Sequence, residues 1–277
     1  MKPTSPHSSR FDPSTCSGSR AESRGKLTVP SLAEGPLALH RAALVIFAKA
    51  PIPGQVKTRL SPPLTPDEAA TLHGSFVLDM LERTKTAVAK LKLPLDRYLA
   101  CAPSATHVFF KIMEERQGVT LIDQVGDDLG ARMTQAFATL FARGCGPVLI
   151  VGTDVPTLPS DHFKQALALL EAHDLVLGPA LDGGYYLIGL RQAAPELFVG
   201  IPWSTGQVLE ITREKATSLG LKAVTIGAWR DVDTIDDLKA LIEAAALDAK
   251  KSKNQRSFSA RTAGVLQLLA KRLQARA

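Results

Sequence analysis

Short, unbroken apolar runs alternate along the chain with longer stretches in which apolar residues recur every three or four positions. The runs 43–48 and 148–151 contain no polar residue at alternate positions. A run of this kind is typical of a strand that is buried on both faces, as in a parallel sheet covered by helices. The longer stretches predict the amphipathic helices that cover such a sheet.

Over the whole chain this pattern predicts an α/β fold, because strands and helices follow one another in turn. The predicted strands are 43–48, 95–101, 119–122, 148–151, 174–179, 185–190 and 222–226. The predicted helices are 65–90, 106–116, 129–143 and 159–172, followed by two that end near 219 and 248. Strands 174–179 and 185–190 are too close for a crossover helix, so a small antiparallel insertion is expected in a doubly wound, mostly parallel sheet.

The two ends of the chain differ from this α/β domain, which spans residues 42–248. Residues 1–41 are rich in Ser, Pro and Arg without apolar periodicity, which predicts a disordered tail, and they lack the apolar core of a secretory signal. Residues 249–277 form a basic linker and an amphipathic helix with Val265, Leu266, Leu269 and Leu273 on one face. This helix either packs on the domain, which we favour, or contacts a partner chain or an anionic membrane.

Charge and cysteine content exclude several classes of protein. The net charge of +6 lies in the ends, because 1–41 and 249–277 together carry +11 and the domain between them carries −5. Nucleic acid is therefore not an expected partner of the domain. Three scattered cysteines without a CxxC pair argue against disulfides or a zinc site and predict a cytoplasmic protein. No run of 18 apolar residues is present, so no membrane-spanning segment is expected.

The most informative site residue follows the apolar run 148–151. The segment Gly152-Thr153-Asp154-Val155-Pro156 comes at the end of this strand, and open α/β sheets bind ligands beyond the carboxyl ends of their strands. A carboxylate there is well placed to hold a metal ion against phosphates, and we predict Asp154 to be a metal ligand. The alternative is a helix cap, but Ser160 and Asp161 are nearer to the next helix.

A basic loop follows the first strand. Lys49, Lys57 and Arg59 surround Gly54 in this proline-rich loop, and such cations suit phosphate recognition because Arg offers a bidentate fork and Lys a point charge. The spacing is not that of a Walker A loop. A solvated basic loop is the alternative.

Two glycine-containing segments are further candidates for ligand contact. Gly130 ends a loop that opens a predicted helix, where free backbone N–H groups favour anions, although the aspartates of this loop are equally candidate helix caps. Gly183 and Gly184 let the backbone approach a ligand, and Asp182 beside them is a candidate general base. A tight antiparallel turn is the alternative for this second segment.

Two late aspartates complete the candidate metal site. Asp231 and Asp233 follow a strand and precede a helix, and either is a candidate to join Asp154 around Mg²⁺ or Mn²⁺, since hard cations prefer several carboxylate oxygens. The alternative for Asp233 is a helix cap.

Five ordered blocks resemble a known family. The chain is similar to the bacterial GT-A-superfamily glycosyltransferases of the arsenosugar-biosynthesis type, also described as radical-SAM/selenodomain-associated. That family is similar in turn to the nucleotidyltransferases of molybdenum-cofactor and 2-phospholactate guanylylation type. The blocks are FAKAPIPGQVKTRL, QVGDDLGARM, VGTDVPTL, GPALDGGYYLIGL and WRDVDTIDDL, within about residues 42–245.

The resemblance implies a Rossmann-like GT-A fold, a nucleoside-diphosphate sugar donor and a divalent metal. It matches Lys57 and Arg59 to the nucleotide-binding loop, Asp154 to the metal aspartate, and Asp231 and Asp233 to the late motif. The loop is proline-rich with one glycine, unlike a pyrophosphorylase loop, so we expect sugar transfer to a small acceptor. The alternatives are a nucleotidyltransferase that uses an NTP, and a non-catalytic nucleotide-binding protein that acts on a partner through its C-terminal helix.

Overall fold

The computed structural model describes residues 41–275, so the predicted disorder of 1–41 lies, except for Arg41, outside the described residues. The strands are β1 (Ala42–Lys49), β2 (Leu95–Ala102), β3 (Thr120–Asp123), β4 (Val148–Gly152), β5 (Leu175–Pro179), β6 (Tyr185–Leu190) and β7 (Ala223–Thr225). The α-helices are α1 (Pro66–Lys90), α2 (Val108–Gln117), α3 (Leu129–Ala142), α4 (Asp161–Leu169), α5 (Val208–Ser218), α6 (Ile235–Asp248) and α7 (Ala260–Gln274). Short 3₁₀ helices cover Thr58–Leu60, Pro195–Phe198 and Lys253–Gln255.

The strands form one seven-stranded sheet in the order β3-β2-β1-β4-β6-β5-β7. β1 is parallel to β2 and β4, while β6 is antiparallel to both of its neighbours, β4 and β5. The predicted fold class and the antiparallel insertion are therefore confirmed. Only a short turn separates β5 from β6, too short for a parallel crossover, so β6 returns antiparallel and lies between β4 and β5.

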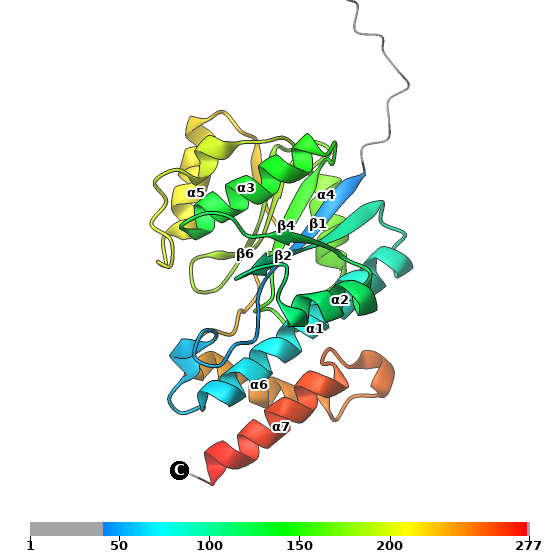
Figure 1. Cartoon of the computed structure of the whole chain (residues 1–277), viewed down its shortest axis with the longest axis vertical. Helices are drawn as coiled ribbons and strands as arrows, with labels where there is room; N and C mark the ends of the chain where they lie inside the picture. Colours follow the sequence, from blue (N-terminus) through cyan, green and yellow to red (C-terminus); the bar gives the residue numbers. More distant parts are fainter. Residues whose placement is uncertain (1–40, 276–277) are drawn as a thin grey trace, which may run out of the picture. The chain divides into compact units, whose positions relative to one another are not determined.

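Helices cover both faces of the sheet, which explains the unbroken apolar runs (Figure 1). Leu44 and Ile46 of β1 share a core cluster with residues of α1, α2 and α4. Ala43 and Val45 point to the opposite face and share a second cluster with residues of α3 and α5.

Two helices begin at capping boxes. The Thr65 hydroxyl accepts a hydrogen bond from the Glu68 amide, and the Thr65 amide donates to the Glu68 carboxylate in return. Pro66 occupies the first helical position, as the sequence predicts. Thr234 and Asp237 form the same reciprocal pair at the start of α6. Asp233 is therefore not the cap of this helix.

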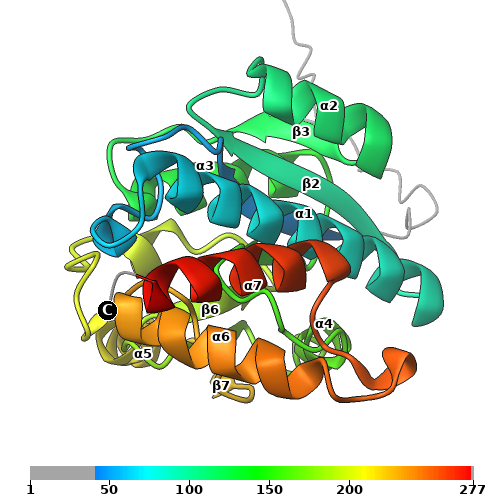
Figure 2. The same cartoon turned by 90° about the horizontal axis from the view of Figure 1, so that it is seen from below.

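The C-terminal helix α7 belongs to the domain. It lies against α1 and α6 (Figure 2), and its apolar face joins theirs in a third core cluster in which Leu266 and Leu269 are 1% and 4% exposed. Arg261 contacts Asp79 at 2.9 Å and Glu82 at 2.7 Å on α1. Packing on the domain is confirmed, and the face that we considered for a partner chain or a membrane is already buried. No helix within residues 41–275 has the length and apolarity needed to cross a membrane.

Candidate active site

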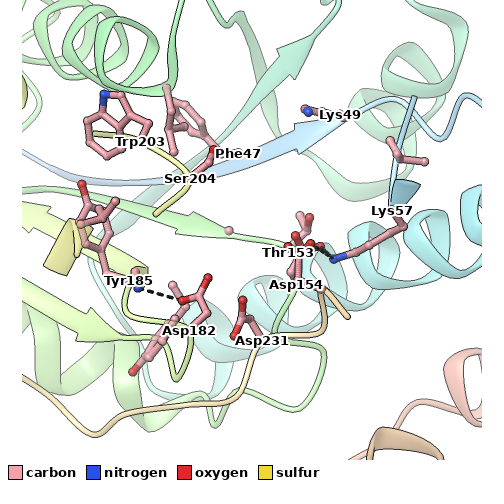
Figure 3. A pocket seen from close by; sticks show the side chains of 18 of the residues that line it. Phe47, Lys49, Lys57, Thr153, Asp154, Asp182, Tyr185, Trp203, Ser204 and Asp231 are labelled. Atoms are coloured by element: carbon pink, nitrogen blue, oxygen red, sulfur yellow. Dashed lines mark hydrogen bonds and ion pairs between the residues drawn. The ribbon is translucent and has the colours of Figure 1, made fainter. Parts of the chain in front are cut away.

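A cavity of about 780 Å³ opens where β1 and β4 end. Because β6 runs antiparallel to β4, its first residue, Tyr185, comes to the same edge of the sheet. The turn before β6, the loop before α5 and the first turn of α3 supply further walls. The cavity thus lies at the edge where open α/β sheets bind ligands. Figure 3 shows Asp154, Asp231 and Asp182 between Lys57 on one side and Tyr185 on the other, with Lys49, Phe47 and Trp203 along a further edge.

The Lys57 side chain lies between two loops that carry acidic residues and contacts both. Its side chain is 3% exposed, and its ammonium group lies 2.8 Å from Oδ1 of Asp154 and 3.9 Å from Oδ1 of Asp233. The same group donates a hydrogen bond to the carbonyl of Val232. Its backbone has a left-handed φ of 49° immediately before the Thr58–Leu60 helix. Lys57 lines the cavity, but its charge is directed to carboxylates within the protein, and its contact with phosphate stays a prediction.

Other cations of the cavity are more open to a ligand. Lys49 at the end of β1 and Arg59 both line it, and the Arg59 side chain is 62% exposed while it donates to Oδ2 of Asp233 at 2.8 Å. Arg132 of α3, which our sequence reasoning missed, lines the cavity and donates to the carbonyl of Gly126 at 2.9 Å. The sequence signal for Arg132 was its place in the first turn of the helix after the glycine-containing loop.

Asp154, Asp182 and Asp231 line the cavity together (Figure 3). Burial, reinforced mainly by the charge of Asp182, raises the pKa of Asp231 to about 6. Burial on its own would raise the pKa of Asp154, but the charges of Lys57, His73 and Lys49 and the hydrogen bond from Lys57 together outweigh this effect and hold the pKa below its ordinary value. These carboxylates therefore interact electrostatically, and the surroundings of Asp154 favour its ionised form.

Asp154 also has a buried histidine beside it that we did not predict. The His73 ring is 3.9 Å from Oδ1 of Asp154 through Nδ1, and its Nε2 lies 3.0 Å from the Lys49 carbonyl. Burial lowers the pKa of His73. A lone histidine inside a long helix carries no sequence signal for this position.

The carboxylates fit a metal ion that arrives with phosphates better than one held by the protein alone. Residues 41–275 contain no group of three or more His, Cys, Asp or Glu that could hold an ion. Asp154, Asp231 and Asp233 of the predicted set all line the cavity, and Asp233 is the one that Arg59 contacts. Mg²⁺ usually binds through one or two carboxylates and completes its shell with water and substrate phosphates. Repulsion among the carboxylates would also fall if a cation bound there.

The predicted glycines mostly shape the walls. Gly184 lines the cavity, whereas Gly54, Gly130 and Gly183 are not among the residues that line it. Gly183 has a φ of 90°, and a Cβ there would lie 2.1 Å from the carbonyl oxygen of Gly206. A Cβ on Gly130 would lie 2.6 Å from the indole of Trp203. These two glycines allow neighbouring loops to pack closely.

Two alternatives that the sequence left open are resolved by hydrogen bonds. Oδ1 of Asp128 accepts from the Ala131 amide at 2.7 Å, so Asp128 caps α3. Oδ1 of Asp182 accepts from the Gly184 amide at 2.8 Å, so Asp182 shapes a tight turn and faces the cavity as well.

Comparison with known proteins identifies the group to which the chain is similar. Residues 86–205 match the family described as "Uncharacterized protein conserved in bacteria" (DUF2064). A solved protein from Desulfovibrio desulfuricans G20, provisionally assigned as a nucleotide-diphospho-sugar transferase, is 33% identical with a TM-score of 0.72. That match covers 84% of this chain and 96% of the other.

More distant solved structures are similar at a lower level. A cytidylyltransferase from Leptospira borgpetersenii is 15% identical, with a TM-score of 0.47 and coverage of 84% of this chain and 95% of the other. The 4-diphosphocytidyl-2C-methyl-D-erythritol synthase of Anaerococcus prevotii is 11% identical, with a TM-score of 0.48 and coverage of 75% and 96%. No curated protein sequence matches. By its family match and its 33% identical relative, the chain belongs to the DUF2064 family of bacterial proteins.

Proposed function

We propose that this protein is a metal-dependent glycosyltransferase that moves a sugar from a nucleoside-diphosphate sugar to a small acceptor. The observation that carries the proposal is one cavity in which exposed cations lie beside interacting carboxylates at the ligand-binding edge of the sheet. Further support comes from the 33% identical relative provisionally assigned as a nucleotide-diphospho-sugar transferase.

The cations and the carboxylates of the cavity have different roles in binding a diphosphate. Lys49, Arg59 and Arg132 are our candidates for phosphate contact, since each lines the cavity. Asp154 and Asp231 are the candidate ligands of Mg²⁺ or Mn²⁺. When bound, such an ion supplies positive charge that neutralises the leaving diphosphate.

Asp182 is the candidate general base for the acceptor hydroxyl. Its Oδ1 is held by the Gly184 amide, which orients the carboxylate into the cavity. An oriented carboxylate accepts a proton only from a hydroxyl within hydrogen-bond reach, so the acceptor has to lie beside the turn before β6.

A thermal-shift screen tests the proposal. Nucleoside diphosphates, their sugar derivatives and NTPs are each added with and without Mg²⁺ or Mn²⁺. We expect metal-dependent stabilisation by a nucleoside diphosphate or its sugar derivative, by about 2.7 kcal/mol at a hundred times the dissociation constant. Asp154→Asn should abolish this metal dependence. Asp236→Asn is the matched control, because the Asp236 side chain is 85% exposed and does not line the cavity.

Other outcomes of the same screen would overturn the proposal. A preference for one NTP, together with pyrophosphate release on turnover, would assign nucleotidyl transfer instead. Unchanged metal-dependent stabilisation of Asp154→Asn would remove the central metal ligand from the proposal. An absence of any nucleotide effect would exclude both transferases.

A further inference from the structure

One side of the cavity is lined by three aromatic side chains, which we call the aromatic wall: Phe47 near the end of β1, Tyr185 at the start of β6, and Trp203 in the loop before α5. All three are partly exposed, and their buried sides pack on the second core cluster. Figure 3 shows Tyr185 and Trp203 on the opposite side of Asp154 from Lys57, and Phe47 beside Lys49. The aromatic wall therefore lies across the cavity from Lys57 and next to Lys49.

Trp203 is held in place without a ligand. The missing Cβ of Gly130 leaves the space that the indole fills, since a Cβ there would come within 2.6 Å of it. The next residue, Ser204, has a left-handed φ of 65° and also lines the cavity. Strained backbone of this kind is concentrated at ligand sites, where surrounding packing maintains it.

Polar groups lie beside the aromatic wall. Among the described residues, the Ser204 hydroxyl and Oδ2 of Asp182 have no hydrogen-bond partner, although both residues line the cavity. Asp231, whose pKa is raised by burial and by the charge of Asp182, lies next to Asp182 (Figure 3). Hydrogen-bond acceptors are thus available next to an exposed aromatic surface.

We propose that the aromatic wall, with Asp182, binds the sugar ring of the substrate; this rests on the proposed glycosyl transfer. The face of an aromatic ring is electron-rich and attracts the slightly positive C–H groups on the apolar face of a sugar. Carboxylates accept hydrogen bonds from the ring hydroxyls, which a sugar has and a nucleobase lacks. A diphosphate bound by Lys49 would bring its attached sugar to the wall, because Lys49 lies beside Phe47 (Figure 3).

The two tryptophans of the chain allow a direct measurement. Trp229 donates to Thr157 and packs on His162 outside the cavity lining, so Trp229→Phe leaves Trp203 as the only tryptophan, which is excited selectively at wavelengths that tyrosine does not absorb. In this variant, UDP-glucose, GDP-mannose and ADP-glucose are titrated with Mg²⁺ and compared with UDP, GDP and ADP. We expect at least one sugar nucleotide to change Trp203 emission where its diphosphate does not.

Two substitutions test the contact by affinity, measured by calorimetry. Trp203→Ala should weaken binding of that sugar nucleotide about five-fold or more and leave the diphosphate affinity within about two-fold. Gly130→Ala should have the same selective effect, because its Cβ displaces the indole. Gly264→Ala is the matched control, since it adds a methyl group to α7 in open space.

Each alternative result has a distinct meaning. Equal emission changes with diphosphates and sugar nucleotides, or equal losses in Trp203→Ala, would assign the wall to the base and overturn this inference while nucleotide binding stands. If no nucleotide binds, the proposed function fails. Saturation-transfer NMR with methyl glycosides then tests separately whether the aromatic wall binds a sugar. Transfer to sugar protons that disappears in Trp203→Ala would support the wall, and no transfer would overturn it.

Discussion

Lys57 links the two loops that carry the acidic residues of the cavity. Its ammonium group contacts the carboxylate of Asp154 and the carbonyl of Val232, and it does so from a left-handed backbone conformation. A non-glycine residue in this conformation costs about 1–2 kcal/mol. The contacts that Lys57 makes offset this cost and set the direction of the Asp154 carboxylate.

A double-mutant cycle measures this link. Lys57→Met leaves Oδ1 of Asp154 buried without its counter-charge, and we expect the free energy of unfolding to fall by about 2 kcal/mol. The double variant Lys57→Met/Asp154→Asn should lose less than the sum of the single variants by about 1 kcal/mol or more in urea unfolding. Strict additivity would show that the two side chains do not interact.

Asp231 gives the stability of the apo-protein a predictable pH dependence. Its pKa is about 6 in the folded protein and about 3.9 in an unfolded chain, so between these values the folded state holds its proton more tightly. Stability from this group is therefore lost as the pH rises from about 4 to about 7. Because Asp231 is partly exposed, we expect at most about 2 kcal/mol.

Urea unfolding of the wild type and of Asp231→Asn across this pH range checks the sign. The variant should lose less stability than the wild type as the pH rises, because asparagine does not titrate. A larger loss in the variant would mean that the pKa of Asp231 is lowered by folding.

Gly183 shows how one missing side chain lets two loops meet. Gly183 and Gly200 both have a left-handed φ, but a Cβ on Gly183 would meet the Gly206 carbonyl while a Cβ on Gly200 would meet open space. We expect Gly200→Ala to cost about 1 kcal/mol from backbone strain alone. Gly183→Ala should cost clearly more in thermal or urea unfolding, and equal losses would mean that the loops separate easily.

At the scale of elements, α7 covers apolar residues of α1 and α6 and forms one helical layer with them. Leu266 and Leu269 are buried between those helices, whereas Leu268 on the opposite face is 69% exposed. We expect Leu266→Ala or Leu269→Ala to lower the free energy of unfolding by about 2–4 kcal/mol. Leu268→Ala is the matched control, at about 0.5 kcal/mol or less. Losses of similar size at all three positions would contradict the packing of α7.

The helices and strands were largely predictable, because their signals are local. β1, β4 and the start of α1 occur where apolar runs and the Thr65 capping box indicate them. The left-handed Lys57 and the 3₁₀ helix after it were not predicted, because their conformation depends on contacts with residues far along the chain.

At the scale of the whole molecule, the C-terminal segment and the sheet share one structure. Asp248 at the end of α6 accepts hydrogen bonds from the amides of Ser257 and Phe258, which leads the chain back to α7. Leu60 and Val232, which flank the cavity loops, share the third core cluster with α7. The segment that reads as a basic tail therefore supports the loops of the site.

Deletion of residues 250–277 tests this dependence. The truncated chain exposes the apolar faces of α1 and α6, so we expect a lower melting temperature and increased binding of a hydrophobic dye. Calorimetry and dye fluorescence measure both. If the truncated chain melts at the wild-type temperature, α7 is not part of the stable core.

The sequence by itself determined the order of strands and helices, the mostly parallel sheet with its insertion, and the edge at which the polar residues gather. It could do so because periodicity, caps and strand ends are properties of neighbouring residues. Only the tertiary structure decided that Lys57 forms an ion pair with Asp154, that Arg59 forms one with Asp233, and that Trp203 lies over Gly130. These contacts join segments far apart in the chain. A local sequence pattern does not distinguish between possible contact partners for a side chain, whereas the packing of distant segments brings one of them into contact.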